Sequence, residues 1–207
     1  MSKTKDRIKA TALELFNQHG VGDTTLRMIA GNLSMSQGNL NYHFKTRQDL
    51  VRTLYYDLVA LLDAQFSEMG NAGTGLSILY QLSYVNMDCL YRYRFFLRDF
   101  YKIMREDEEI RAHYQQLQVL RTEQFKGVFA MLIQQSVLRS EEFEGEFARF
   151  YLRMNIIGDN WINAQELLMG EVDDPVGYYR DLLFEMIYPY LTFTGKREYL
   201  SLIKGDN

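Results

Sequence analysis

Apolar residues recur at helical spacing throughout this chain, and proline interrupts the pattern at only two positions of 207, Pro175 and Pro189. Residues 8–16 are an example, with side chains at i, i+4, i+7 and i+8 that fall on one face of a helix. No stretch alternates apolar and polar residues for long enough to indicate a β-sheet. The sequence therefore predicts an all-α fold.

Two amphipathic helices are expected near the N-terminus. The first ends at Gly20, a residue suited to a left-handed C-terminal cap. The second has its apolar face over residues 26–33, and Asp23, Thr24 or Thr25 can cap it.

A short third helix follows after a turn of only Ser34 and Met35. Ser36 is a good N-cap for it, and the helix is expected to end near Phe44. Three helices with so short a turn between the second and the third form a helix-turn-helix arrangement, in which the third helix is offered to the major groove of DNA.

The side chains of this third helix fit that interpretation. Over residues 36–43 almost every side chain is an uncharged hydrogen-bonding group, and Leu40 is the only aliphatic anchor. Glycine and asparagine are poor helix formers, so helix propensity does not explain the composition. Side-chain amides can pair with the edge of adenine, and the cations Lys45 and Arg47 follow directly.

Charge is divided unevenly along the chain. The formal net charge is −4, but residues 1–50 hold seven Lys and Arg against four Asp and Glu, so they carry +3 and the remainder carries −7. Only the first region would be drawn toward phosphate. The carboxylates of REDEEIR at 105–111 and EEFEGE at 141–146 are interpreted as solvated faces.

Beyond the third helix, longer helices are predicted. Thr46 caps the next one, which continues through leucines until NAGTG at 71–75 interrupts it. The later helices are expected at 76 to about 93, 94–104, about 109–135, 140–169, from Pro175 until Pro189 bends or ends it, and 197–203.

Several classes of protein are excluded by what the sequence lacks. A single cysteine, Cys89, allows neither an internal disulfide nor a cysteine-based zinc site. No leader and no apolar run of roughly 20 residues is visible, so a cytoplasmic protein without a membrane partner is expected. The three histidines lack metal-ligand spacing and no glycine-rich phosphate loop occurs, so we expect no metal, no cofactor and no enzymatic activity.

At this point the motifs resemble a known family. The helix ending in HG at 19–20, TTLRMIA at 24–30 and SQGNLNYHFKTRQDL at 36–50 are similar to the DNA-binding domain of TetR-type transcriptional repressors. The motif S-x-G-x-L-x-x-H-F-K is met at every fixed position. The resemblance implies a helix-turn-helix DNA-binding domain over 1–50 and a larger helical effector-binding and dimerisation domain over 51–207.

The resemblance also implies roles for individual residues. Gln37, Asn39 and Asn41 would face base edges, although Asn41 stands where the family most often has a tyrosine. Gly38 would allow a close approach to the duplex, with a helix–helix contact as the alternative. The expected DNA-binding residues are Thr24, Thr25, Ser36, Gln37, Gly38, Asn39, Asn41, Tyr42, His43, Lys45 and Arg47, where N-capping also explains the threonines and packing also explains Tyr42 and His43.

The rest of the chain is expected to form the dimer interface and to bind a small-molecule effector. The resemblance implies a homodimer through about 140–169 and 176–192, since such operators are two-fold symmetric, but periodicity does not choose the shared faces. Large adaptable side chains in the middle of the chain suit a mostly apolar effector, with core packing as the alternative. The expected ligand residues are Tyr84, Met87, Tyr91, Phe96, Phe100, Met104, Tyr114, Phe125 and Trp161.

The sequence thus predicts a DNA-binding regulator, most simply a repressor that a small apolar or aromatic effector releases from a palindromic operator. The alternative is a helical protein that sequesters a small molecule and does not bind DNA. A steep fall of DNA affinity with salt would distinguish a regulator from an enzyme.

Overall fold

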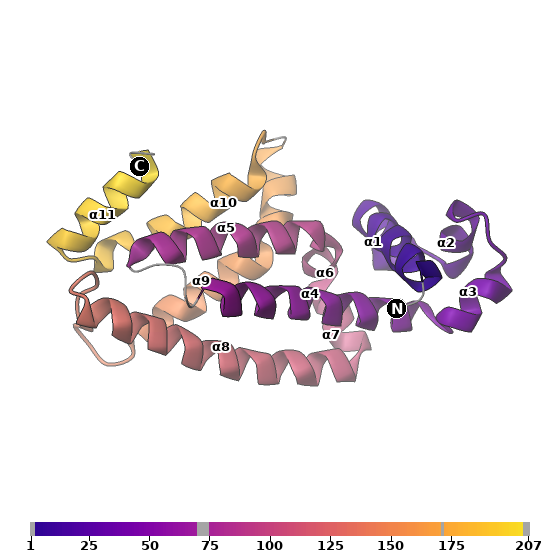
Figure 1. Ribbon diagram of the computed structural model, residues 1–207, viewed down its shortest axis with the longest axis horizontal. Coiled ribbons are helices and arrows are strands. Elements are labelled where there is room, and N and C mark those ends of the chain that lie inside the picture. Colours follow the sequence, from indigo (N-terminus) through magenta and orange to yellow (C-terminus); the bar gives the residue numbers. More distant parts are fainter. Residues whose placement is uncertain (1–2, 70–74, 171, 205–207) are drawn as a thin grey trace. The chain divides into compact units, whose positions relative to one another are not determined.

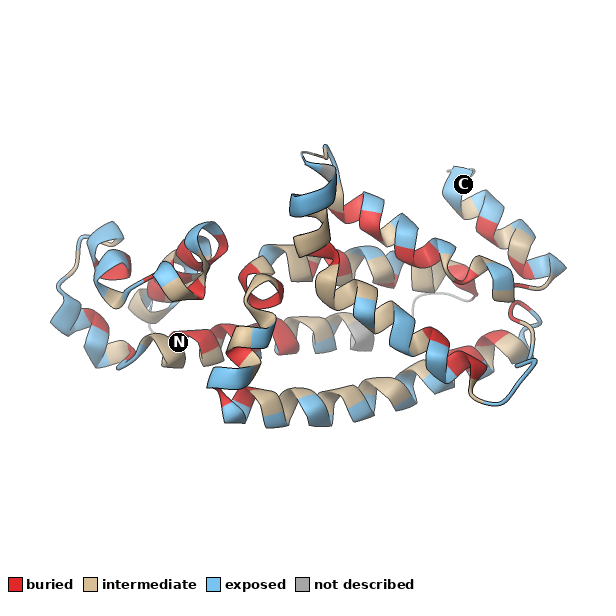
Figure 2. Ribbon diagram, turned by 180° about the vertical axis from the view of Figure 1, so that it is seen from behind, coloured by how far each residue is buried: buried red, intermediate tan, exposed pale blue. Residues whose placement is uncertain are grey.

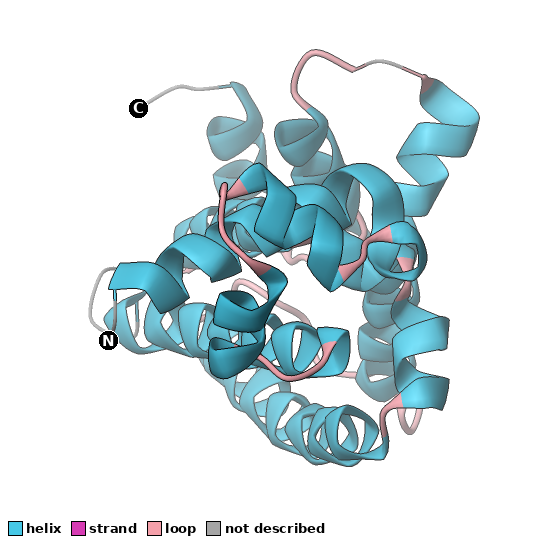
Figure 3. Cartoon of the chain, turned by 90° about the vertical axis from the view of Figure 1, so that its right-hand side faces the viewer, coloured by secondary structure: helices cyan, strands magenta, loops and turns pink. Residues whose placement is uncertain are grey.

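The structure is a computed structural model that describes residues 3–69, 75–170 and 172–204, and most of the predicted interruption at 71–75 lies outside these residues (Figure 1). Helices dominate the described residues (Figure 3). Leu138 and Leu191 form an isolated antiparallel bridge. The all-α prediction is confirmed. Among these helices none is both long enough and apolar enough to cross a bilayer.

The helices follow one another closely along the chain. In order they are α1 (Lys3–Asp23), α2 (Leu26–Asn32), α3 (Gln37–His43), α4 (Arg47–Met69), α5 (Leu76–Arg92), α6 (Arg94–Arg98), α7 (Phe100–Glu106), α8 (Glu108–Gln134), α9 (Glu146–Ala164), the π-helical segment η1 (Gln165–Met169), α10 (Pro175–Glu185), the 3₁₀ turn η2 (Tyr188–Tyr190) and α11 (Phe193–Lys204).

The chain divides into two compact units. Residues 1–62 and 89–113 form the N-terminal unit, and residues 63–88 and 114–207 form the C-terminal unit. Helix α4 therefore runs on through residue 50, where the DNA-binding domain was predicted to end. The predicted division into functional domains at residue 50 remains a prediction.

In the N-terminal unit, the first helix is anchored to α6 by a buried amide. The Asn17 side chain donates to the carbonyl oxygen of Arg92 at 2.8 Å and accepts from the amide of Phe95 at 2.9 Å. Three residues later Gly20 takes φ +79° and ψ 164°, so α1 kinks there and continues to Asp23 instead of ending. The Asp99 carboxylate accepts from the amide of Val21 at 2.6 Å, just beyond the kink.

A buried carboxylate joins α4 to the start of α8. Asp107 is only 1% exposed and accepts from Arg52 at 2.7 Å, Gln48 at 2.6 Å and the amide of Ile110 at 3.0 Å. Burial raises the pKa of this carboxyl, but the three hydrogen bonds and the nearby guanidinium outweigh burial and hold the pKa below its usual value. The interpretation of REDEEIR as a wholly solvated face was therefore wrong at Asp107.

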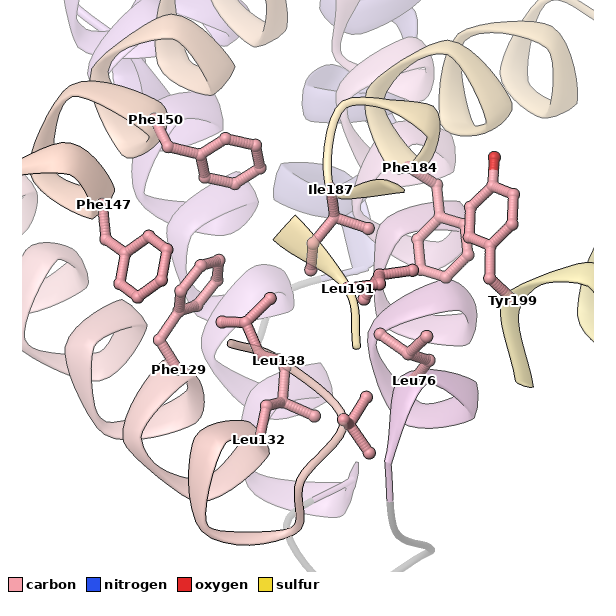
Figure 4. Close-up of a cluster of buried hydrophobic side chains, with 11 residues drawn as sticks. Leu76, Phe129, Leu132, Leu138, Phe147, Phe150, Phe184, Ile187, Leu191 and Tyr199 are labelled. Atoms are coloured by element: carbon pink, nitrogen blue, oxygen red, sulfur yellow. The ribbon is translucent and has the colours of Figure 1, made fainter. Parts of the chain in front are cut away.

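The C-terminal unit has an apolar core to which α5, α8, α9, α10 and α11 all contribute (Figure 4). Rings of Phe184 and Tyr199 stack there with centroids 5.1 Å apart, and Phe129 meets Phe147 edge to face at 5.0 Å. Each such side chain contributes about 1.5–3 kcal/mol on burial, so this cluster accounts for much of the unit's stability. Figure 2 shows buried and exposed residues alternating around the helices, as amphipathic packing requires.

The predicted helix from 140 to 169 begins later, at Glu146. The Arg139 guanidinium donates two hydrogen bonds to the Glu146 carboxylate, at 2.8 and 2.7 Å. The amide of Glu142 donates to the same carboxylate at 2.9 Å. These bonds hold residues 140–145 in a non-helical loop and lower the pKa of Glu146 to about 2. EEFEGE is thus a second acidic stretch whose interpretation as solvated was wrong at one residue.

Candidate nucleic-acid interface

Helices α2 and α3 and the turn between them form the predicted helix-turn-helix. Ser34 has φ +52°, and the amides of Ser34 and Met35 donate to the carbonyls of Gly31 and Ala30 at 3.0 Å, which closes the end of α2. Ser36 then caps α3, because its Oγ accepts from the amide of Asn39 at 3.2 Å. Both helix limits of α3 agree with the sequence prediction.

Two apolar side chains fix the orientation of α3. Leu40 is fully buried against the rest of the N-terminal unit, and Phe44, the C-terminal cap residue, is 3% exposed. The opposite surface of this short helix is therefore left to solvent. It carries Gln37, Gly38, Asn39, Asn41 and Tyr42, all of which are exposed, and Tyr42 is 84% exposed.

Gly38 lies in open space. A Cβ atom added there would meet no heavy atom within 4 Å. The alternative in which this glycine serves a helix–helix contact within the chain is therefore wrong. The remaining interpretation, a close approach to the duplex, stays a prediction.

The aromatic pair at the end of α3 is only partly packed. Tyr42 and His43 touch edge to face with ring centroids 5.3 Å apart, and His43 is half-buried. The high exposure of Tyr42 leaves its phenol at the surface, where a phosphate could be met.

The two threonines at the start of α2 differ in their surroundings. Thr24 is 0% exposed, and its hydroxyl donates to the carbonyls of Leu15 at 3.2 Å and Gly20 at 2.9 Å. Thr25 is exposed, and its Oγ caps α2 by accepting from the amide of Met28 at 3.2 Å. Thr24 is thus committed to the fold, and only Thr25 presents a hydroxyl at the surface.

The start of α4 is closed by a reciprocal cap. The amide of Thr46 donates to Asp49 at 2.9 Å, and the amide of Asp49 donates to the Thr46 hydroxyl at 3.1 Å, as the prediction of a Thr46 cap requires. Lys45, just before this cap, is exposed. Arg47 instead donates to the carbonyl of Gly22 at 2.8 Å, so the guanidinium ties α4 to the last turn of α1.

Sequence analysis missed one cation at this surface. Lys5 on α1 places its ammonium 5.3 Å from the centroid of the Phe44 ring, beside the end of α3. Its spacing along α1 gave no signal, because the contact joins residues far apart in the chain.

The expected effector residues fall in both units. Tyr91, Phe96, Phe100 and Met104 belong to the N-terminal unit, where the rings of Phe96 and Phe100 meet edge to face at 5.7 Å. Phe96 also packs on Tyr55, at 5.2 Å between centroids. The other five expected residues, Tyr84, Met87, Tyr114, Phe125 and Trp161, belong to the C-terminal unit.

Those five have different surroundings. Met87 and Trp161 are buried in the packing of their own unit, and the ring of Trp161 lies 4.9 Å from that of Tyr179. Tyr84 is exposed beneath the guanidinium of Arg180, 5.4 Å away.

The last two of the five lie on α8. Phe125 meets the ring of Tyr151 at 4.5 Å, and the Tyr114 phenol donates to both carboxylate oxygens of Asp159 at 3.3 and 3.2 Å. Sequence analysis did not single out Asp159, although it is a lone charge in the otherwise uncharged stretch 154–165.

Known proteins match this arrangement over nearly the whole chain. The sequence model of the family described as "Bacterial regulatory proteins, tetR family" matches residues 8–54, and that of "Bacterial transcriptional repressor", of TetR type, matches residues 52–199. A TetR-family transcriptional regulator from Marinobacter aquaeolei VT8 is similar in structure, with TM-score 0.88, 24% identity and coverage of 99% of this chain and 98% of that one.

Two further solved structures share the fold at lower identity. The ketosteroid transcriptional regulator KstR2 of Mycobacterium tuberculosis has TM-score 0.71 at 13% identity, covering 93% of this chain and 97% of that one. A transcriptional regulator from Saccharomonospora viridis, solved in complex with choline, has TM-score 0.71 at 17% identity, covering 93% and 100%. The matched families and structures are regulators of transcription rather than enzymes.

Proposed function

This chain belongs to the TetR family of bacterial transcriptional regulators, and we propose that it represses transcription by binding a palindromic operator as a homodimer until a small-molecule effector releases it. Family members bind operator DNA and function as dimers. The observation that carries the proposal is the exposed surface of α3, whose amides have Leu40 and Phe44 behind them and solvent in front.

Base reading is assigned to the amides of that surface. Gln37 and Asn39 occupy the first turn of α3, where side chains of a recognition helix reach base edges, and an amide can pair with adenine N6 and N7 together. Asn41 lies on the same exposed helix and adds a third amide. Loss of one bidentate pair costs about 1–3 kcal/mol of discrimination between operator and other sequences.

Phosphate contacts are assigned to the periphery. Lys45, Thr25, Tyr42, His43 and the Ser36 hydroxyl are placed around α3, and Lys5 joins them because of its contact with Phe44. Arg47 contributes more by holding α4 to the last turn of α1 than by its charge.

Paired substitutions test this assignment. Gln37→Ala should weaken operator binding by roughly 5–150-fold and leave binding to random duplex nearly unchanged. Lys45→Ala should weaken both and reduce the slope of log affinity against log salt by about 1. Gln18→Ala on α1 and Lys126→Ala on α8 remove the same exposed groups elsewhere and serve as controls. Equal losses of specific and random binding in Gln37→Ala would contradict base reading by α3.

Dimerisation is proposed through the outer faces of α9 and α10. Leu152 and Ile156 are one turn apart on α9 and each is 57% exposed, while Tyr178 and Leu182 are one turn apart on α10 and are exposed too. The buried aromatics of the same helices belong to the unit's own core. An exposed apolar surface on two long helices supports an interface between copies.

Oligomeric state tests the assignment. Ile156→Asp should convert the dimer to a monomer in sedimentation experiments and abolish operator binding at the same protein concentration. Val119→Asp on α8 changes another exposed apolar residue and should leave the dimer intact. A dimer that survives Leu152→Asp and Ile156→Asp together would place the interface elsewhere.

Release is proposed to follow from binding of a small, mostly apolar or aromatic effector in the helical domain. The aromatic side chains of α5, α8 and α9 supply surface for such a compound. One structural relative was solved in complex with choline, and two others are named for a ketosteroid and for fatty acid degradation, which supports a small-molecule effector for this chain. An effector can release the protein from DNA only by binding more tightly to the conformation that does not fit the operator than to the one that does. Each tenfold loss of operator affinity requires a difference of about 1.4 kcal/mol between these two binding free energies.

A further inference from the structure

Helices α8 and α9 face each other in the C-terminal unit through a row that mixes aromatic and polar side chains. Tyr151, Asn155 and Asp159 follow one another at intervals of four residues and so share one face of α9. From α8, Tyr114 reaches Asp159 and Phe125 packs on Tyr151. All of these side chains are half-buried, so the row is partly accessible.

Asp159 has no counter-ion in this row. Its only hydrogen-bond partner within the described ranges is the Tyr114 phenol, and no Lys, Arg or His of those ranges lies within 4 Å of its carboxylate. Arg121 on α8, whose charge acts on Tyr151, forms an ion pair with Asp63. Burial accordingly raises the pKa of Asp159 to about 6, and the phenol offsets this only in part.

Three other buried or half-buried carboxylates pair with cations, whereas the half-buried Asp49, Asp99 and Glu198 each accept a hydrogen bond from a backbone amide. Asp107 has Arg52 at 2.7 Å, Glu146 has Arg139 at 2.7 Å and Asp57 has Lys9 at 2.7 Å. A buried carboxylate without a cation destabilises a fold, and an asparagine of the same shape would avoid the cost. Asp159 has neither kind of partner, so it is better explained by a positively charged group that none of the described residues supplies.

We propose that Asp159 binds a positively charged group of the effector, an amine or a quaternary ammonium, between α8 and α9. The aromatic rings of Tyr114 and Tyr151 lie in the same row and provide faces that attract a cation. Phe125, further along α8, packs beside Tyr151 and receives the apolar part of the compound. This inference rests on the proposed effector function and narrows its ligand from apolar compounds in general to apolar cations.

A panel of matched small molecules tests the charge requirement. Each member of the panel has one apolar body, from phenylethyl and naphthylmethyl to octyl, and carries in turn an ammonium, a trimethylammonium, a hydroxyl or a carboxylate. Calorimetry on the full-length protein at pH 7.5 should detect the cations at up to millimolar concentration, with the hydroxyl and carboxylate members at least tenfold weaker.

Variants then locate the site. Asp159→Asn should weaken the cationic probes at least tenfold and change the binding of neutral ones less than twofold. Asp173→Asn removes an exposed negative charge from the loop before α10 and should change the binding of neither kind of probe. Tyr114→Phe, which keeps the ring and loses the hydroxyl, should retain most of the cation binding.

Each outcome decides the proposal. Absence of binding by every cation in the panel, equal binding of cation and alcohol, or unchanged cation binding in Asp159→Asn would overturn it. If neutral members bind and release operator DNA, the effector function stands and the charge assignment fails. If cations bind through Asp159 but leave operator affinity unchanged, the site stands and the regulatory function fails.

Discussion

Replacing Asp159 with asparagine should make the ligand-free protein more stable at neutral pH and leave its stability unchanged in acid. The carboxylate loses water on burial and gains only a phenol, so its charged form is disfavoured in the folded state. Asparagine has nearly the same shape, can still accept from Tyr114 and carries no charge. The gain in stability is therefore a direct measure of an uncompensated charge.

The magnitude follows from the pKa. The pKa of Asp159 rises from an ordinary 3.8 to about 6, and each unit corresponds to about 1.4 kcal/mol, so the cost at neutral pH is at most about 3 kcal/mol. Solvent reaches the half-buried group and reduces the cost, so we expect about 1–2 kcal/mol. Because the folded state holds the proton more tightly, the penalty is absent below about pH 4, develops between about pH 4 and 6, and is complete above that range.

Urea unfolding followed by circular dichroism between pH 4.5 and 8, at one fixed protein concentration, measures the difference. The gap between variant and wild type should widen toward high pH, while Asp173→Asn should give a flat, small difference. A wild type that is more stable than Asp159→Asn at pH 8, or a gap that does not change with pH, would refute the reasoning.

Three further predictions concern the N-terminal unit. Gly20→Ala should destabilise the protein by about 1–3 kcal/mol in thermal unfolding, because φ +79° strains a residue with a Cβ and that atom would lie 3.3 Å from an oxygen of Asp99; an unchanged melting temperature would contradict this. Thr24→Val should cost about 1–3 kcal/mol in urea and leave the salt slope of DNA binding unchanged, and a reduced slope would instead favour a phosphate contact. Asp107→Asn should destabilise at pH 7 with a gap that closes as pH falls below about 4, since the pKa of Asp107 is lowered in the folded state. Urea unfolding at several pH values measures how this stability difference changes with pH, and the expected sign is opposite to that for Asp159→Asn.

The helix-turn-helix could be predicted almost residue by residue, because its signals are local. Ser36 caps α3 through an amide three residues away, and Leu40 is the only aliphatic side chain within the helix and turns inward. The choice among Asp23, Thr24 and Thr25 could not be made in the same way. Thr25 caps α2, while Thr24 is buried beneath carbonyls of α1, and that burial depends on how two helices pack.

The interpretation of the two acidic stretches as solvated faces was wrong for the same reason. Asp107 and Glu146 look like their solvated neighbours in sequence, and only Arg52 on α4 and Arg139 before α9 distinguish them. Asp159 is the converse case, since it is half-buried and its hydrogen-bond partner among the described residues is a phenol rather than a cation. Periodicity predicts which face a side chain occupies but not which partner lies opposite.

The open space around Gly38 has a practical consequence for protein engineering. A Cβ atom fits there without meeting another heavy atom, and alanine would favour the helical conformation of α3 by about 1 kcal/mol. A Gly38→Ala variant with a higher melting temperature and a lower affinity for the operator would show that the added methyl group interferes with DNA binding and not with the fold.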